Sequence, residues 1–185
     1  MEKMRFGILG AARIAASALI PAIKKSSNAT VAAVAARDAA RAQTYAAEHG
    51  IPKSYGSYEA MLADPEIEAV YNPLPNSEHA PWAIKALEAG KHVLVEKSFT
   101  LNAAQAEQVA AAAAKAGRMV MEAFMYRFHP QIGQAQEIIK RGDIGELRLI
   151  RPSFSFFLSR PADIRWVTKL GGGALYDIGT YCVNV

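Results

Sequence analysis

Short apolar runs alternate along this chain with longer stretches in which apolar residues recur at helical spacing. The apolar runs lie at residues 4–9, 30–36, 65–71, 92–95 and 119–126. Helices are predicted from the turn at Gly10 to about residue 25, with Pro21 as a point of interruption, through Leu87 to a stop at Gly90, and over 103–116 to a stop at Gly117. Because strands that alternate with helices of about ten or more residues form βαβ units, the pattern predicts a parallel sheet.

The first of these turns resembles a phosphate-binding turn. Read against the dinucleotide fingerprint G-x-G-x-x-G, the chain keeps the first glycine as Gly10 and has alanine at the next two positions, Ala12 and Ala15. Small residues still let the backbone approach a pyrophosphate, and the N–H groups of the following helix face it. Arg13, in the first helical turn, can add a charge-assisted contact. A tight strand-to-helix turn in any α/β protein has a similar sequence, so this turn alone does not establish a nucleotide site.

The end of the second predicted strand indicates which dinucleotide would bind. An NAD enzyme of this type carries Asp or Glu there to hydrogen-bond the adenosine ribose, whereas this chain has Ala36 followed by Arg37. A guanidinium pairs with a 2′-phosphate that a carboxylate would repel, so the sequence favours NADP over NAD. The alternative is that Arg37 is solvated while Asp38 caps the following helix. The two interpretations use different residues and are compatible.

The strongest candidate chemistry lies at the end of the run His92-Val-Leu-Val-Glu-Lys-Ser. In an open α/β sheet the ligand crevice lies beyond the carboxyl ends of the strands, which places Glu96 and Lys97 in a site. Burial and a neighbouring cation lower the pKa of a lysine, which would let Lys97 take and return a proton during carbonyl/alcohol interconversion. For this segment alone, the alternative is a surface lysine beside a glutamate.

Beyond these turns the chain divides into two predicted domains. A dinucleotide-binding domain is expected over residues 1–125, and the beginning of a second domain over residues 126–185. In the first, two prolines of the loop 72–79 fix its backbone and hold Asn76 and His79 at the sheet edge. In the second, residues 147–157 partly alternate apolar with polar side chains and are predicted to form the first strand of another sheet.

Taken together, the motifs resemble the family of glucose-fructose oxidoreductase, inositol dehydrogenase and MocA-like oxidoreductases. The resemblance covers nearly the whole chain, and the motifs occur in the family's order. They are the Gly10 turn, Asn72-Pro-Leu-Pro-Asn76 with His79, Glu96-Lys97, Tyr126-Arg-Phe-His-Pro130, and Trp166 with Gly171-Gly-Gly-Ala-Leu-Tyr-Asp177-Ile-Gly-Thr-Tyr181. Within the family, the first turn and Tyr181 are similar to the branch of dimeric dihydrodiol dehydrogenases, aldose dehydrogenases and glucose-fructose oxidoreductase.

The resemblance implies a fold, an activity and a set of site residues. The fold is a Rossmann-type doubly wound parallel sheet followed by the start of an α+β antiparallel-sheet domain. The activity is hydride transfer between NADP, or NAD, and a hydroxyl of a sugar (aldose) or a trans-dihydrodiol, which requires no metal. The implied cofactor-binding residues are Gly10, Ala12, Arg13, Ile14, Ala36, Arg37, Leu74, Asn76, His79, Glu96, Lys97 and Arg127.

Three catalytic residues are implied by the same resemblance. Tyr181 would donate or accept the proton, and the ammonium of Lys97 would lower the pKa of its phenol. Asp177 would orient the substrate hydroxyls. Trp166 and Tyr176 are candidates to line a sugar pocket, with simple packing as the alternative.

The chain departs from the family pattern at two places. Ser98 replaces the proline that usually follows Glu-Lys and stiffens the bend, which leaves Lys97 less firmly placed. The chain also stops at Val185, where family members continue into a sheet that closes the substrate site and forms a homo-oligomer interface. We therefore expect a fragment, and the alternative function is a catalytically silent nucleotide-binding fragment.

Composition narrows the class of function further. The 185 residues are 51% hydrophobic with a net charge of +4, and the basic residues are dispersed, which argues against a nucleic-acid partner. The lone Cys182 excludes an intramolecular disulfide, and the histidines show no metal-ligand spacing. No apolar run is long enough for a signal peptide or a membrane span, so we expect a cytoplasmic protein.

Overall fold

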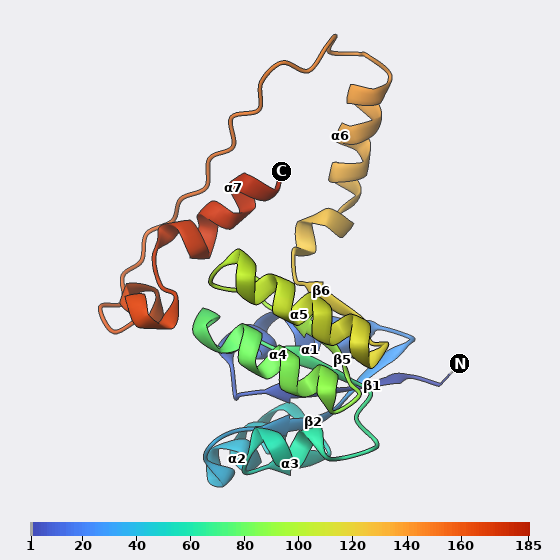
Figure 1. Ribbon diagram of the computed structural model, residues 1–185, viewed down its shortest axis with the longest axis vertical. Coiled ribbons are helices and arrows are strands. Elements are labelled where there is room, and N and C mark those ends of the chain that lie inside the picture. Colours follow the sequence, from blue (N-terminus) through green and yellow to red (C-terminus); the bar gives the residue numbers. More distant parts are fainter. Residues whose placement is uncertain (1) are drawn as a thin grey trace.

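The computed structural model describes residues 2–185 and contains a six-stranded parallel sheet (Figure 1). The strands are β1 (Met4–Leu9), β2 (Ala29–Ala35), β3 (Lys53–Tyr55), β4 (Ala69–Asn72), β5 (His92–Val95) and β6 (Val120–Glu122). Their order across the sheet is β3-β2-β1-β4-β5-β6, and every neighbouring pair is parallel. The chain changes direction across the sheet between β1 and β4, which is the switch point of a Rossmann-type fold. The predicted doubly wound parallel sheet is confirmed.

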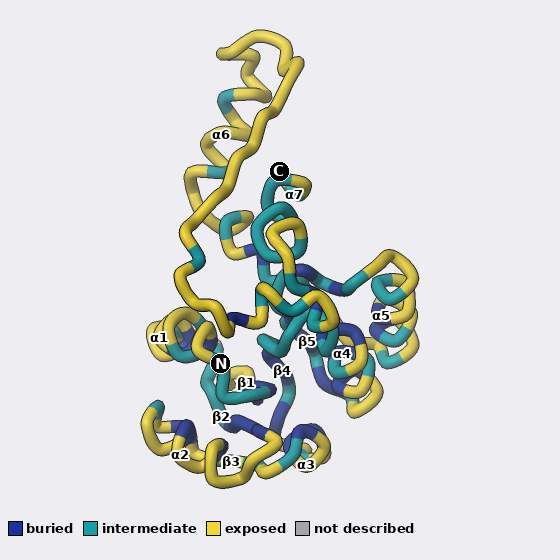
Figure 2. Tube along the Cα trace, turned by 90° about the vertical axis from the view of Figure 1, so that its left-hand side faces the viewer, coloured by how far each residue is buried: buried dark blue, intermediate teal, exposed yellow. Residues whose placement is uncertain are grey.

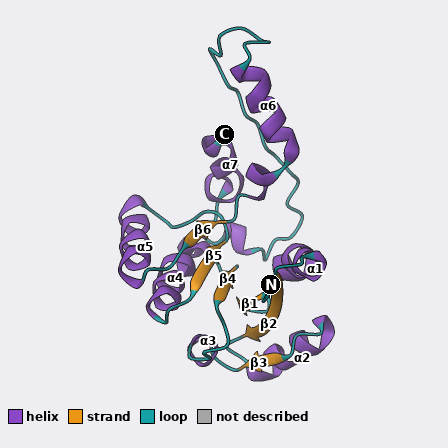
Figure 3. Cartoon of the chain, turned by 90° about the vertical axis from the view of Figure 1, so that its right-hand side faces the viewer, coloured by secondary structure: helices purple, strands orange, loops and turns teal. Residues whose placement is uncertain are grey.

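Helices cover both faces of this sheet (Figure 2, Figure 3). One face carries α1 (Ile20–Lys25) and α2 (Ala39–His49), and the other carries α3 (Tyr58–Leu62), α4 (His79–Glu88) and α5 (Ala103–Ala116). Successive strand residues point to opposite faces. Ile8 belongs to the buried cluster of Ile20 and Tyr45, and Leu9 belongs to the cluster of Leu87 on the opposite side. None of the helices formed by residues 2–185 is long and apolar enough to cross a membrane.

The helix boundaries follow local signals in the sequence. The Asp38 carboxylate accepts hydrogen bonds from the N–H groups of Ala40 (2.9 Å) and Arg41 (3.2 Å), so Asp38 caps α2 as expected. Gly117 ends α5 with a φ of +62°, a left-handed conformation that glycine adopts without strain. The predicted bounds of this helix, 103–116, are confirmed.

The helix after the first turn differs from the prediction, because it does not break at Pro21. Residues 13–25 are helical throughout, and Ala15–Leu19 form a wider π turn that leads into α1. Proline lacks the N–H that would bond the carbonyl four residues earlier, at Ser17. A π turn changes the hydrogen-bond pattern locally, so the helix continues through the proline.

Residues beyond β6 leave the sheet. The helix α6 (Pro130–Lys140) projects away from the body of the protein and buries none of its residues (Figure 1). The strand predicted over 147–157 is wrong for the chain as described: these residues are exposed and pair with no strand among residues 2–185. An alternating pattern gives a strand only where a neighbour satisfies the backbone N–H and C=O groups. The chain then returns across the carboxyl ends of the sheet strands and ends in α7 (Thr180–Asn184).

The substitution Leu87→Ala should lower the free energy of unfolding by about 2–5 kcal/mol, because the wholly buried Leu87 side chain would leave a cavity between α4 and the sheet. Leu149→Ala is the matched control: Leu149 is 64% exposed, and its replacement should change stability by less than about 0.5 kcal/mol. Urea unfolding followed by circular dichroism measures both values. Equal losses for the two variants would contradict this description of the core.

Candidate active site at the carboxyl ends of the strands

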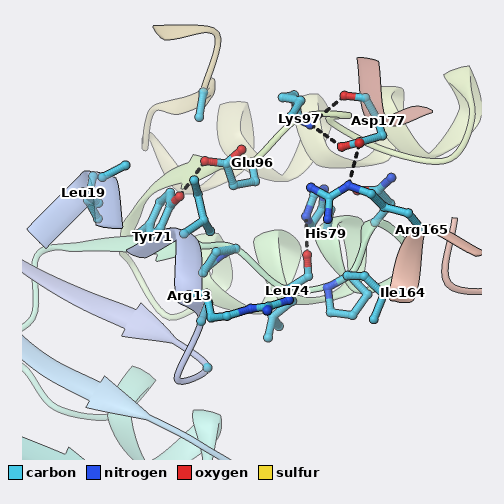
Figure 4. A pocket seen from close by; sticks show the side chains of 18 of the residues that line it. Arg13, Leu19, Tyr71, Leu74, His79, Glu96, Lys97, Ile164, Arg165 and Asp177 are labelled. Atoms are coloured by element: carbon cyan, nitrogen blue, oxygen red, sulfur yellow. Dashed lines mark hydrogen bonds and ion pairs between the residues drawn. The ribbon is translucent and has the colours of Figure 1, made fainter. Parts of the chain in front are cut away.

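A cavity of about 1130 Å³ opens at the carboxyl ends of β1, β2, β4 and β5 (Figure 4). This exceeds the roughly 300–1,000 Å³ of typical small-molecule pockets and leaves room for a ligand the size of a dinucleotide. Phe154, Phe156 and residues between 160 and 181 line it on the side away from the sheet. The lining includes thirteen of the fourteen residues predicted as catalytic or cofactor-binding: Gly10, Ala12, Arg13, Ile14, Ala36, Arg37, Leu74, Asn76, His79, Glu96, Lys97, Asp177 and Tyr181.

The first turn of the cavity depends on a glycine. Gly10 has a φ of +84°, in the left-handed region, and a Cβ there would lie 3.0 Å from Cδ2 of Leu74. A side chain would be strained and would fill the space beside the loop after β4. The Ala12 carbonyl accepts a hydrogen bond from the Tyr45 hydroxyl at 2.9 Å, which anchors the turn to α2. Arg13 reaches from this turn to within 3.8 Å of the Asp163 carboxylate.

Two arginines, not one, stand at the end of β2. Ala36 is buried, and Arg37 is exposed and lines the cavity. Arg41, from the first turn of α2, was missed by the sequence analysis; it lines the same wall and donates from Nη2 to the Ala11 carbonyl at 3.1 Å. Burial raises the pKa of the neighbouring Tyr58 hydroxyl, and the charges of Arg37 and Arg41 oppose that rise. This end of the cavity is therefore cationic.

The loop after β4 is fixed by its own polar side chains. His79 is wholly buried, with Nδ1 2.7 Å from the Ser98 carbonyl and Nε2 2.8 Å from the Leu74 carbonyl. Burial lowers the pKa of His79, although the two carbonyls favour its protonated form. Asn76 donates from Nδ2 to the Gly171 carbonyl at 2.8 Å. Both predicted site residues thus connect segments of the protein that surround the cavity.

Glu96 is held by a tyrosine that the sequence analysis did not single out. The hydroxyl of Tyr71, in β4, donates to Oε1 of Glu96 at 2.5 Å. Burial, followed by the charge of Glu96, raises the pKa of Tyr71, so this hydroxyl stays protonated. No side chain or backbone N–H within residues 2–185 donates to Oε2 of Glu96. One carboxylate oxygen is therefore fixed, and the other is left for a ligand.

Lys97 forms the central ion pair of the site (Figure 4). Its Nζ lies 2.8 Å from Oδ1 of Asp177 and 2.7 Å from the Asp177 carbonyl. Oδ2 of Asp177 accepts a hydrogen bond from Nε of Arg165 at 2.5 Å. Burial alone would raise the pKa of Asp177, but the hydrogen bonds from Arg165 and Lys97 hold it below its ordinary value. Asp177 is thus ionised at neutral pH, between two cations.

Ser98 secures the bend that follows Lys97. Its hydroxyl donates to the Tyr176 carbonyl at 2.7 Å, and its own carbonyl contacts the His79 ring. The Lys97–Ser98 peptide bond is cis. These contacts hold Ser98, and the Asp177 pair holds Lys97, so both residues have defined partners at the position where the family has proline.

Tyr181 lies beside this pair among other aromatic rings. Its ring centroid is 5.5 Å from that of Phe124, 5.4 Å from that of Phe154 and 5.4 Å from Nζ of Lys97. The expected lowering of its pKa by Lys97 is wrong. Burial, and after it the carboxylates of Glu96 and Asp177, raise the pKa of Tyr181 to about 12. The phenol therefore keeps its proton at neutral pH.

Arg127 is the predicted cofactor residue that does not line the cavity. Its Nε donates to Oδ1 of Asn184 at 3.0 Å, and its guanidinium lies 5.7 Å from the Phe124 ring. Trp166 and Tyr176 also lie outside the lining. Trp166 is exposed and donates to the Arg160 carbonyl, while the Tyr176 hydroxyl donates to the Leu101 carbonyl. The packing alternative fits the half-buried Tyr176, whereas the exposed Trp166 neither lines the cavity nor packs in a core.

Comparisons with known proteins agree with this geometry. The sequence profile described as "Oxidoreductase family, NAD-binding Rossmann fold" (GFO/IDH/MocA) matches residues 4–124. The profile of the GFO/IDH/MocA C-terminal domain matches residues 132–185. Among curated relatives, D-xylose 1-dehydrogenase (NADP(+)) 2 of Haloferax volcanii is 46% identical over 182 residues, which are 98% of this chain and 55% of the relative.

Solved structures are similar over nearly the whole chain. Aldose-aldose oxidoreductase from Caulobacter crescentus, complexed with glycerol, has a TM-score of 0.90 at 31% identity and covers 99% of this chain and 56% of its own. A 3-ketoreductase from Actinomadura kijaniata, in complex with NADP and TDP-benzene, has a TM-score of 0.86 at 38% identity and covers 97% and 55%. The chain spans about half the length of these relatives.

Acid should release the segment that carries Asp163 and Asp177. Hydrogen bonds and charges from arginine and lysine hold the pKa of both carboxyls below the ordinary value, against the effect of burial. Their ion pairs therefore stabilise the position of this segment over the cavity above about pH 4. This stabilisation is lost as the pH falls through the lowered pKa values of the two carboxyls. In a Trp82→Phe variant, Trp166 is the only tryptophan. Its fluorescence should be constant from about pH 5 to 8 and change below about pH 4.

Two variants test the assignment of this transition. Asp177→Asn should show at pH 7 the Trp166 signal that the parent shows in acid, because Arg165 and Lys97 lose their shared partner. Asp143→Asn removes an exposed carboxylate that pairs only with Arg141, and its pH profile should match the parent. A parent transition centred near neutral pH would refute the ion-pair explanation.

Proposed function

This chain belongs to the GFO/IDH/MocA oxidoreductase family, and on that premise we propose that it is an NADP-preferring oxidoreductase that transfers hydride between nicotinamide and a hydroxyl-bearing carbon of an aldose or a related cyclic diol. One observation carries the proposal. A single cavity joins a cationic wall at the end of β2 to the cluster of Lys97, Asp177 and Tyr181 beyond β5.

The residues of the cavity fit a dinucleotide with a 2′-phosphate. Gly10 brings the backbone of the first turn close to the cavity, and the N–H groups at the start of the following helix lack helical partners and suit a pyrophosphate. Arg37 and Arg41 line the cavity at the end of β2 and would pair with a 2′-phosphate, and the nearby Asp38 carboxylate is occupied by backbone N–H groups. The free oxygen of Glu96 suits a ribose hydroxyl.

The reacting groups suit the reduction of a carbonyl. A nicotinamide bound in the cavity would supply the hydride. The Tyr181 hydroxyl keeps its proton at neutral pH and would donate it to the carbonyl oxygen as hydride arrives. Lys97 has three ammonium donors, of which Asp177 takes two, so one remains for the same oxygen. The oxidative direction is the reverse step, in which Tyr181 would start as the phenoxide and accept the hydroxyl proton; the raised pKa of Tyr181 disfavours that form at neutral pH.

The walls around Tyr181 favour a ring-shaped, polyhydroxylated substrate. Phe154, Phe156 and Met125 line the same cavity as the polar cluster of Lys97 and Asp177. A sugar ring or a cyclic diol offers an apolar face to such aromatics and hydroxyls to the charged groups. The relatives named D-xylose 1-dehydrogenase and aldose-aldose oxidoreductase support an aldose as the first substrate to test.

Cofactor preference tests the cationic wall. The protein should bind NADPH more tightly than NADH, and Arg37→Gln should weaken NADPH binding about tenfold while leaving NADH unchanged, because only the 2′-phosphate pairs with the guanidinium. Titration of the nicotinamide fluorescence measures all four affinities. Equal affinity of the unsubstituted protein for NADPH and NADH would remove the basis for an NADP enzyme.

Turnover tests the proton donor. Tyr181→Phe should lower kcat for aldose or cyclic-diol conversion by about 10²- to 10⁴-fold, with NADPH affinity unchanged, because only the transferred proton is lost. Tyr55→Phe is the matched control: this hydroxyl binds Asp64 away from the cavity, and kcat should stay at the parent value. Activity of Tyr181→Phe equal to the parent would exclude Tyr181 as the donor. NADPH binding without turnover of any tested sugar or diol would favour the silent nucleotide-binding alternative.

A further inference from the structure

A second group of charges lies in the cavity, around Asp163. The Asp163 side chain is only 1% exposed, and three guanidinium groups surround it. Arg165 donates to Oδ1 from its backbone N–H and from Nη1, both at 3.1 Å. Nη2 of Arg160 lies 3.3 Å from Oδ2, and Nη2 of Arg13 lies 3.8 Å from it. All four residues line the cavity.

The two carboxylate oxygens of Asp163 differ in the hydrogen bonds that they accept. Oδ1 has its hydrogen bonds, whereas Oδ2 is buried and forms none with any group of residues 2–185. Arg13 and Arg160 are close enough to balance its charge, but neither donates to it in hydrogen-bond geometry. A guanidinium carries five N–H donors. Arg13 and Arg160 therefore keep donors for an anion that enters between them.

The groups around Asp163 carry a surplus of positive charge. Three guanidinium groups, those of Arg13, Arg160 and Arg165, surround this one carboxylate, and Arg165 is shared with Asp177. A surplus of positive charge next to the first turn of a dinucleotide fold suits a pyrophosphate, which is anionic and binds at the start of the following helix.

We propose that Arg160 and Arg13 bind the pyrophosphate of the dinucleotide from two sides. In this proposal the Asp163 carboxylate holds both guanidinium groups in place before the ligand binds. Arg13 comes from the first turn. Arg160 lies 147 positions later in the chain, in the crossing segment, residues 160–181, which lines the cavity on the side away from the sheet. The crossing segment then belongs to the cofactor site and does more than cover it. The inference rests on the proposed function for the identity of the ligand.

Three probes separate the pyrophosphate from the rest of the dinucleotide. NADPH contains both phosphate sites, inorganic pyrophosphate contains only the bridging group, and adenosine 2′-monophosphate contains only the end that Arg37 and Arg41 face. Arg160→Gln should weaken NADPH and pyrophosphate binding about tenfold and leave adenosine 2′-monophosphate unchanged. Arg160→Lys should recover part of the loss, because lysine keeps the positive charge but lacks the paired N–H donors of a guanidinium. Arg148→Gln, which removes an exposed arginine paired with Glu146, is the control for net charge and should bind all three like the parent.

Each outcome decides the inference. NADPH and pyrophosphate affinities that stay at the parent value in Arg160→Gln would overturn the proposal, as would an equal loss for adenosine 2′-monophosphate. Circular dichroism of each variant confirms that the fold is intact. If the parent protein binds no NADPH, the proposed function fails. Binding of pyrophosphate that depends on Arg160 would then still support the anion site, and its absence would overturn that as well.

Discussion

The Lys97–Asp177 ion pair is the interaction on which the site depends. Its partners come from positions 80 residues apart, and their side chains are only 14% and 13% exposed. Two charges removed from water need each other and additional hydrogen bonds, and a lone partner would leave an uncompensated buried charge at a cost of about 3–5 kcal/mol. Arg165 supplies the additional hydrogen bond to Asp177. The pair therefore joins the crossing segment to the edge of the sheet and encloses the cavity.

The same pair explains why Tyr181 differs from the sequence-based expectation. A lysine lowers the pKa of a neighbouring phenol when its charge is free to act on the phenoxide. Here the nearest anion to the Lys97 ammonium is Asp177, and the half-buried Tyr181 lies near three carboxylates, Glu96, Asp177 and Glu122. Burial and the surrounding negative charge both disfavour the phenoxide, so the balance favours the neutral phenol. In the proposed reaction, Tyr181 thus starts as an acid.

Local patterns in the sequence predicted the elements of the fold, and long-range packing decided the rest. The apolar run ending in Glu96-Lys97, the Asp38 cap and the Gly117 stop depend on neighbours a few residues away, and all three are confirmed. Arg41 left a usable signal, since it lies four positions after Arg37 at the start of the next helix. Tyr71 left none, because only the pairing of β4 with β5 brings it near Glu96.

The predictions that failed, like the residues that were missed, depend on long-range packing. Residues 147–157 have a strand-like pattern, but a pattern cannot supply the neighbour that a strand requires. Asp163 and Arg165 occur in a stretch without a periodic signal, and their role depends on where the crossing segment meets the first turn. There, positive and negative side chains alternate from Arg13 through Asp163, Arg165 and Asp177 to Lys97. In the proposed enzyme, an anion bound by Arg13 competes with Asp163 for that guanidinium. Asp163 then depends more on Arg165, which it shares with Asp177. Cofactor binding and the placement of Lys97 are therefore parts of one electrostatic arrangement.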